Sequence, residues 1–323
     1  MKNELLRFYF SIRLLYLVLL LSGILINCGN RNNLIVKNEK KSFKIMNEEK
    51  KDYMLNYRFG SAPYEILIND MVCSIDLESG MPGPIDLNEF LVNSSQQKIK
   101  IKISHPFVHK GGLLKKNDIY FFNKDLIINN VYFDENENMQ LDSISKLSFP
   151  DIETPVPYIE NEWTFNASLP FSLTGWKDSK DLRAFDKEEL EQMVVLKFEE
   201  LWKMLNDGDN AGFMTQLKFR NKEFYLSNYF NDEQVAEYET NLSNTYLKHK
   251  NNMIPMDNYR MRILGDGKAV SLERLGKHKG QGVLLAEDEQ EKVLYLNYVT
   301  LHIPEGKEKL EIVRINPLIT SLE

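Results

Sequence analysis

The chain has 323 residues, of which 43% are hydrophobic and 27% are charged. This length suits two domains better than one, and the apolar content is too high for a disordered chain. Two cysteines exclude a disulfide scaffold and any metal site built from several cysteines. The formal net charge of −7 argues against a nucleic-acid partner, because such proteins neutralise phosphates with lysine and arginine.

The first 27 residues are organised like a bacterial secretion signal. Lys2, Arg7 and Arg13 precede an apolar stretch over residues 14–26 that is interrupted only by Ser22 and Gly23. The stretch is short for a membrane-spanning helix, which needs about 20 apolar residues. It has the length of the apolar region of a signal peptide. The sequence therefore predicts a signal peptide over residues 1–27.

The four residues Leu-Ile-Asn-Cys at 25–28 resemble the cleavage site of bacterial lipoproteins. In that family the signal peptidase cuts before the cysteine, whose thiol carries diacylglycerol. The resemblance implies that Cys28 is lipidated and anchors the chain in a membrane. The sequence departs from the family at Asn27, where Gly, Ala or Ser is preferred. A simple signal anchor and cleavage at another position are the alternatives.

Residues 28–52 are rich in Asn, Lys and Glu and have no apolar period, which predicts a solvated tether. Their seven basic and four acidic residues give a charge of +3, suited to anionic head groups. Without the signal peptide and the tether, 30 basic and 42 acidic residues remain, a charge of −12. We expect the folded body to stand in the periplasm or outside the cell. Its charge should repel nucleic acid and bare anionic membrane.

Residues 53–183 have the pattern of short strands. Residues 98–103 alternate lysine and isoleucine, as in a strand with one wet and one buried face. Strands are also expected at 64–68, 71–77, 118–122, 125–133 and 162–173, with a turn at Asn69-Asp70 and a loop over 79–84. Such spacing predicts an antiparallel β-sandwich. Residues 84–91 with the strand at 98–103 resemble the strand-turn-strand of accessory jelly-roll and immunoglobulin-like domains, which bind sugars or pad larger extracellular proteins.

Residues 184–323 begin with helical spacing. Asp186 and Glu189 form a capping pattern, and Gly208 ends the first helix. Two further helices are expected over 210–226 and 231–249. Strands follow at 259–264, 268–275, 282–286, 292–303 and 310–315, with a hairpin turn at 265–267. Three helices on an antiparallel sheet make an α+β domain. Its topology resembles the cystatin-like and nuclear-transport-factor-2-like folds.

The motifs of nucleotide-binding loops, zinc proteases, serine hydrolases and paired cysteines do not occur in the sequence. Residues 134–142 place oxygen ligands at alternate positions, as a calcium loop does. Met139 stands where such a loop needs glycine, and Ser145 where it needs a closing carboxylate. An acidic turn between strands is the simpler interpretation. We expect no catalytic residue, no cofactor and no metal.

The histidines and Cys73 have structural interpretations. Cys73 lies in a strand-like run and is expected to be a small buried apolar residue. Along a strand, His105 and His109 would lie about 13 Å apart, too far to share a zinc ion. His278 lies in a basic, glycine-containing loop. That loop either binds an anion or is a solvated hairpin. His249 or His302 would support an enzyme only if one met a carboxylate in a pocket.

Aromatic residues are the remaining candidates for a binding site. Trp163 and Trp176 would form a sugar-stacking platform if both were exposed, although aromatic residues in strands are usually core. In the second half, aromatic residues between 202 and 230 could line a conical pocket or fill the core. The hypothesis is an envelope lipoprotein that acts as a binding or interaction module, with an envelope protein or a glycan as partner. The alternatives are a small-molecule enzyme using the C-terminal pocket and a carbohydrate-binding accessory protein.

Overall fold

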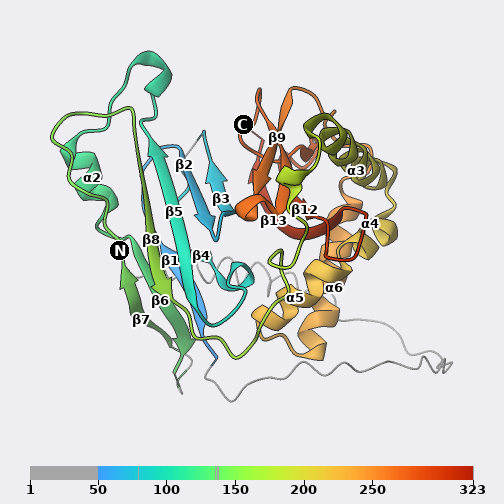
Figure 1. The fold of residues 1–323 in the computed structure, drawn as a ribbon, viewed down its shortest axis with the longest axis horizontal. Coiled ribbons are helices and arrows are strands. Elements are labelled where there is room, and N and C mark those ends of the chain that lie inside the picture. The colour runs from blue at the N-terminus through green and yellow to red at the C-terminus, as the bar shows by residue number, and fades with distance from the viewer. Residues whose placement is uncertain (1–49, 79, 135, 137, 323) are drawn as a thin grey trace. The chain divides into compact units, whose positions relative to one another are not determined.

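The computed structural model describes residues 50–78, 80–134, 136 and 138–322 (Figure 1). The predicted signal peptide, Cys28 and almost all of the predicted tether lie outside these residues. Residues 44–323 form one compact unit. Within the described residues the fold is mixed α/β, with three antiparallel sheets and five α-helices. None of these helices is long and apolar enough to cross a bilayer.

Two four-stranded antiparallel sheets contain the strands described before residue 167. Their strand orders are β4-β1-β6-β7 and β3-β2-β5-β8. Side chains of both sheets, including Leu55 and Ile66, belong to one buried core. The strands of the first sheet are β1 (Asp52–Asn56), β4 (Ile85–Asp86), β6 (Ile127–Phe133) and β7 (Met139–Lys146). Those of the second are β2 (Tyr64–Ile68), β3 (Met71–Asp76), β5 (Gln96–Ser104) and β8 (Tyr158–Asn166).

The alternating pattern over residues 98–103 is confirmed in β5. Ile99, Ile101 and Ile103 are fully buried, whereas the lysines between them are exposed or half-buried. The predicted turn between β2 and β3 is also confirmed. Asn69 and Asp70 have positive φ angles of 50° and 62°, as both central residues of a two-residue hairpin turn of type I′ must.

The strand expected at residues 118–122 is wrong. These residues lie in helix α2 (Lys116–Phe122). Ile119 and Phe122 are three positions apart and both buried, so a helix directs them to the same side. The carboxylate of Asp118 accepts a hydrogen bond from the backbone N–H of Lys115 at 2.7 Å and caps the first turn. The apolar residues over 119–122 do not alternate with polar ones, so their pattern does not favour a strand. Their spacing suits a helix, which is what forms.

The part of the chain after residue 183 contains four helices and a five-stranded antiparallel sheet. The sheet has the order β11-β12-β10-β9, and β13 pairs with β12 as well. The helices are α3 (Lys187–Asp207), α4 (Asn210–Gln216), α5 (Lys218–Ser227) and α6 (Asp232–Leu247). The strands are β9 (Tyr259–Leu264), β10 (Ala269–Arg274), β11 (Leu284–Asp288), β12 (Val293–His302) and β13 (Glu311–Ser321).

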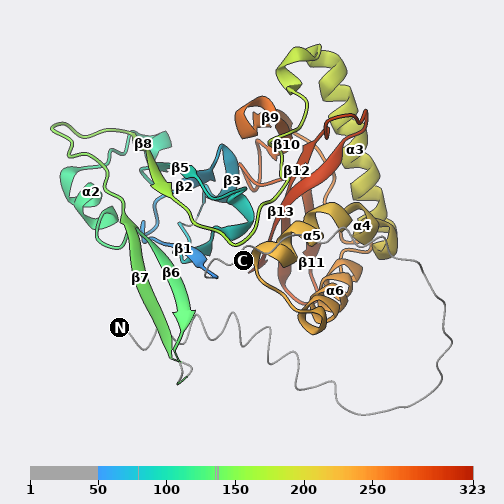
Figure 2. The same cartoon turned by 60° about the horizontal axis from the view of Figure 1, so that its bottom comes forward.

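Helix α3 packs against this sheet, as Figure 2 shows. Its buried residues recur at helical spacing and share a core with β10: Leu190, Val194, Phe198, Leu201 and Leu205. Asp186 caps its N-terminus by accepting from the N–H groups of Glu188 and Glu189, as predicted. Gly208 ends it with a φ of 78°, also as predicted.

The number of helices differs from the prediction, because residues 210–226 form two helices and not one. The break falls at Leu217, which ends α4 and begins α5. Phe213 and Leu217 are buried in the core beneath α3, whereas Phe219 and Leu226 pack against the core of the first two sheets. One straight helix has a single apolar stripe, so the chain changes direction where the second core begins.

Within the described residues, no sheet combines strands from 53–183 with strands from 184–323. The buried core of the first two sheets nevertheless includes four side chains from the later part: Leu264, Ala269, Tyr298 and Val313. A sheet-rich part is thus followed by an α+β part. The division into domains at residue 183 and the sandwich topology remain predictions.

Candidate functional site

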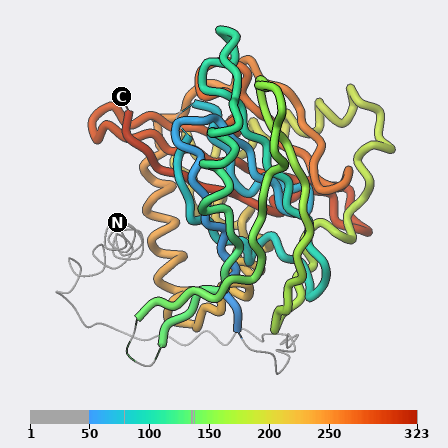
Figure 3. Tube along the Cα trace, turned by 90° about the vertical axis from the view of Figure 1, so that its left-hand side faces the viewer, coloured from blue at the N-terminus to red at the C-terminus, as the bar shows by residue number. Residues whose placement is uncertain are grey.

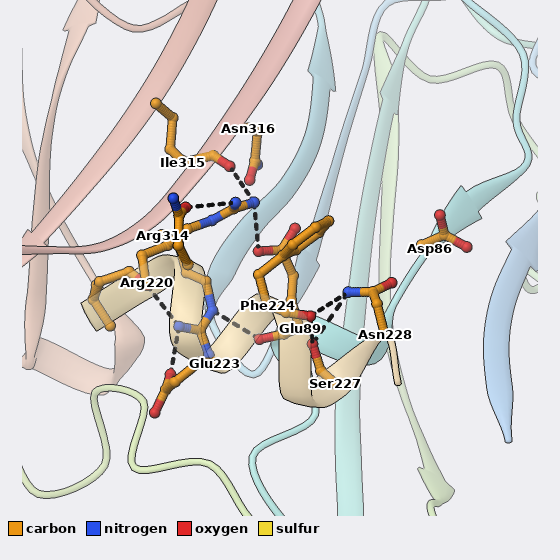
Figure 4. Close-up of polar contacts among 12 residues, drawn as sticks. Asp86, Glu89, Arg220, Glu223, Phe224, Ser227, Asn228, Arg314, Ile315 and Asn316 are labelled. Carbon is orange, nitrogen blue, oxygen red and sulfur yellow. Dashed lines mark hydrogen bonds and ion pairs between the residues drawn. The ribbon is translucent and has the colours of Figure 1, made fainter. Parts of the chain in front are cut away.

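Two buried ion pairs connect η1 (Asn88–Phe90), α5 and β13 (Figure 4). Arg220 Nη2 lies 3.1 Å from Glu89 Oε2, and Arg314 Nη1 lies 2.8 Å from Glu223 Oε2. The Arg220, Arg314 and Glu223 side chains are almost fully buried. We call these four residues the buried arginine cluster.

Backbone groups and aromatic rings complete the buried arginine cluster. Arg314 Nε donates to the backbone carbonyl of Glu89 at 2.7 Å, and Glu223 Oε1 accepts from the N–H of Gly175 at 2.8 Å. The Arg220 guanidinium lies 4.2 Å from the centroid of the Phe224 ring, and that of Arg314 lies 5.2 Å from the Trp176 ring. These contacts keep the two cations stable away from water.

Electrostatics hold the Arg220 guanidinium charged. Burial disfavours the cation, but Glu89 and the Tyr238 hydroxyl overcome that effect and raise the pKa of Arg220. Tyr238 Oη accepts from Arg220 Nη1 at 3.2 Å. Arg220 Nε and Arg314 Nη2 are buried without a hydrogen-bond partner among the described residues. Because each carboxylate pairs with a guanidinium from another element, the cluster is suited to holding the parts of the fold together.

Sequence reasoning missed the buried arginine cluster. Its pairs join residues 131 and 91 positions apart, which spacing cannot reveal. The one available signal is Arg314, a charged residue in the run Ile312-Val313-Arg314-Ile315. A charge inside an otherwise apolar strand usually has a buried partner.

A second buried ionic group surrounds Glu273 on β10, whose side chain is fully buried. Arg260 donates to its Oε2 through Nε at 3.0 Å and through Nη2 at 2.8 Å. Arg262 Nη1 donates to Oε1 at 2.8 Å and also pairs with Glu65 of β2. The Tyr298 hydroxyl donates to the same Oε1 at 2.6 Å. Burial, together with the charge of Glu273, raises the pKa of Tyr298, which therefore stays protonated.

The two histidines that would have indicated an enzyme contact neutral groups. His249 Nδ1 lies 3.1 Å from the carbonyl of Thr245, and its Nε2 lies 3.0 Å from Asn297 Nδ2. His302 Nδ1 lies 2.7 Å from Ser179 Oγ. Burial lowers the pKa of His249 to about 4. Burial, with the nearby Arg314 and Lys307 charges, lowers the pKa of His302 to about 3. Both imidazoles are therefore neutral near pH 7.

The other three histidines lie apart from these. The ring of His105 contacts the loop after β5, where its Nδ1 accepts from the N–H of Phe107 at 3.1 Å. His109 is exposed. His278 lies between two carboxylates, with Nδ1 3.9 Å from Glu78 and Nε2 3.6 Å from Glu287.

The two tryptophans chosen from the sequence are not equivalent. Trp176 is 5% exposed, and its ring lies against Arg314. Trp163 is half-buried on β8; its Nε1 donates to the carbonyl of Ser148 at 3.2 Å, and its ring packs edge-on against Phe149. A platform of two exposed indole faces is not formed. Sugar binding would depend on Trp163 alone.

The acidic segment at 134–138 joins β6 to β7, as the simpler interpretation expected. Asp134 Oδ1 accepts from the N–H groups of Asn136 and Asn138, each at 2.9 Å, and these and neighbouring hydrogen bonds lower its pKa. The described residues contain no group of three or more His, Cys, Asp or Glu that could hold a metal ion. Cys73 is buried, as expected, and burial raises the pKa of its thiol.

A small surface pocket of about 90 Å³ lies where the β2–β3 turn meets the β9–β10 turn. Charged residues of both signs line it: Lys98, Lys100, Asp70, Glu162 and Asp266. The two cations therefore meet three carboxylates. None of the predicted site residues lines it.

The loop between β5 and α2 exposes apolar side chains together with lysines. Phe107 is 57% exposed, Val108 40% and Leu113 42%. Tyr120 on α2 and Tyr158 at the start of β8 are also exposed. Figure 3 shows the segment from β5 to α2, in blue-green, on the side that faces the viewer. We call the exposed apolar and lysine residues of this loop the aromatic–lysine surface: Phe107, Val108, Lys110, Leu113 and Lys115.

Three lysine ammonium groups in this loop and in the elements that flank it lie over aromatic rings. Lys110 Nζ is 5.8 Å from the Phe107 centroid, Lys102 Nζ is 4.6 Å from the Tyr158 centroid, and Lys124 Nζ is 5.0 Å from the Tyr120 centroid. Each contact places a cation at the outer edge of an apolar side chain.

Hydrogen bonds fix the backbone of this loop. The N–H groups of Lys110 and Gly112 both donate to the carbonyl of Phe107 at 2.9 Å. Gly111 has a φ of 79°, which favours glycine. A Cβ at position 112 would lie 2.1 Å from Nδ1 of His105. Phe107 and Leu113 are thus exposed on a loop with a defined backbone conformation.

No family model, curated protein or solved structure matches the chain.

Proposed function

We propose that the protein is an envelope lipoprotein, anchored through Cys28, whose folded body acts as a binding module. The aromatic–lysine surface is the binding face in this proposal. The exposure of Phe107, Val108 and Leu113 on one hydrogen-bonded loop carries it. An exposed apolar group leaves free energy to be gained when a partner covers it.

The buried ionic groups support this choice of face. The carboxylates of the buried arginine cluster and of Glu273 are bound by guanidinium or hydroxyl groups within the fold. Because these carboxylates are occupied inside the fold, contact with a partner is left to the surface. The resemblance of residues 25–28 to a lipoprotein signal supports the envelope location.

Lysine accessibility tests the binding face. Lys110 should react more slowly with an amine-specific reagent in the intact cell envelope than in the purified, unanchored protein. Lys279 is exposed and lies outside the surface, so it serves as the matched lysine whose reactivity should not change. Equal labelling of Lys110 in envelope and solution would show that nothing covers this face.

A further inference from the structure

We infer that the partner of the aromatic–lysine surface is a lipid bilayer with anionic head groups. This inference rests on the proposed function, because it names the partner of the same surface. In it, Phe107, Val108 and Leu113 enter the boundary between head groups and acyl chains, and the lysines contact lipid phosphates.

The exposed apolar groups are close together in the chain. Phe107, Val108 and Leu113 lie within seven residues of one loop. Hydrogen bonds from the N–H groups of Lys110 and Gly112 to the Phe107 carbonyl fix the backbone that carries them. A bilayer accepts apolar side chains of different shapes without requiring complementary pockets, which suits a short protruding set.

The loop offers two lysines that no carboxylate of the described residues pairs with. Residues 105–118 contain Lys110, Lys115 and Lys116 and one acidic residue, Asp118, in a body that carries −12. Lys116 pairs with Asp151 at 3.4 Å. Lys110 and Lys115 have no carboxylate partner within the described part of the chain. The loop can approach anionic head groups through these two lysines, while the rest of the body is repelled and stays away from the membrane.

Lys110 lies over the ring of Phe107 on this loop, with its Nζ 5.8 Å from the ring centroid. At a membrane surface an aromatic ring lies at the level of the head groups, and a lysine beside it reaches toward the phosphates. A nucleic acid would need a broader basic surface than a body of this charge offers.

The predicted tether allows this contact with the bilayer that holds the anchor. An extended chain spans about 3.5 Å per residue, so residues 28–50 could reach on the order of 80 Å. The surface can therefore meet a bilayer without displacing Cys28. A second contact at the same membrane would also restrict the orientation of the body.

The experiment measures vesicle binding without the lipid anchor. Residues 44–323, which form one compact unit, are mixed with phosphatidylcholine vesicles with or without phosphatidylglycerol, and bound protein is measured by co-sedimentation. We expect binding to the anionic vesicles, weaker binding to the neutral ones, and loss of binding at high salt. Circular dichroism of each protein confirms that it is folded.

Two pairs of variants locate the contact. Phe107→Ser with Leu113→Ser should weaken binding about tenfold, because apolar area is lost from the membrane contact. Leu196→Ser with Ile319→Ser is the matched control, since these residues are 65% and 56% exposed elsewhere. Lys110→Glu with Lys115→Glu should weaken binding about tenfold or more, and Lys279→Glu should change it little.

The outcomes separate this inference from the proposed function. Absence of binding to anionic vesicles, or equal effects of the loop and control variants, overturns the inference. If Lys110 is protected in the envelope but not by anionic vesicles, the face binds a protein or glycan and the lipid inference fails alone. If Lys110 is protected in neither, the proposed binding face fails as well.

Discussion

Arg314 Nη1 donates to Glu223 Oε2 at 2.8 Å, and both side chains are almost fully buried. Arg314 also donates to the carbonyl of Glu89, so one side chain connects β13, α5 and η1. A buried ion pair is a weak source of net stability, because desolvation opposes the attraction. Its removal from one side is nevertheless costly, since the remaining charge stays buried without its partner.

Arg314→Met should therefore lower the free energy of unfolding by about 3–5 kcal/mol, measured by urea denaturation. The double variant Arg314→Met with Glu223→Met should lose less, because no unpaired carboxylate is left. Lys203→Met is the control: its pair with Asp207 is exposed, and the change should stay within about 0.5 kcal/mol. Similar losses for Arg314→Met and Lys203→Met would contradict this account of the pair.

Contacts between the two predicted domains give a second prediction. The β3 strand lies at the edge of its sheet, and its carbonyls at Val72 and Cys73 accept from Asn316 Nδ2 at 2.6 and 3.2 Å. The Ile75 carbonyl accepts from Gln281 Nε2 at 3.0 Å. A fragment of residues 53–183 would expose this edge and lose those partners.

We expect the 53–183 fragment to fold but to melt at a lower temperature than the same region in the full chain. Asn316→Ala in the full chain should destabilise in the same direction by about 1 kcal/mol, since two buried carbonyls lose a donor. Calorimetry of the fragment and of the full chain measures both. A fragment that melts at the temperature of the intact protein would mean that these contacts add nothing to stability.

Local patterns predicted most of the strands and the helix ends. The alternation at Ile99, Ile101 and Ile103 reflects burial of one strand face, which depends only on neighbours in sequence. The caps at Asp186 and Gly208 are local for the same reason. The break at Leu217 was missed because it depends on two cores that meet beside α4 and α5. The spacing of apolar residues along the chain does not show where those two cores meet.

The candidate site was harder to predict than the fold. Phe107 and Leu113 are exposed on a loop whose position depends on the tertiary fold, and in sequence the same residues would fit a buried segment. The Lys102–Tyr158 contact joins neighbouring strands whose pairing is known only from the fold. Trp176 illustrates the converse: an aromatic residue chosen for a ligand proves to cover a buried arginine.

Lipidation of Cys28 gives a third prediction. Cys28→Ala should abolish incorporation of a clickable fatty acid and release the protein from membranes, because that thiol would carry the diacylglycerol. Cys73→Ala is the matched control: it removes the other cysteine, which is buried in the fold, and should leave labelling unchanged. Continued labelling of the Cys28→Ala protein, or an unlabelled natural chain, would show that the anchor is assigned to the wrong residue.

The buried histidines give the last prediction, on pH and stability. The pKa values of His249 and His302 in the folded protein are about 4 and about 3, below the ordinary value of about 6.5 for an unfolded chain. At pH values between the pKa of the folded state and that of the unfolded state, the unfolded chain binds protons that the folded protein does not. The free energy of unfolding therefore falls as the pH falls. Each histidine should remove on the order of 2 kcal/mol of unfolding free energy between pH 7 and pH 5, a range above the titration of most carboxylates.

Urea denaturation at the two pH values should show this loss, and His249→Gln should reduce the loss by about half. The exposed His109 serves as the control, since His109→Gln should leave the free energy of unfolding at pH 7 unchanged. An unfolding free energy that is the same at pH 7 and pH 5, or equal slopes for His249→Gln and the natural chain, would mean that these imidazoles are not held neutral by burial.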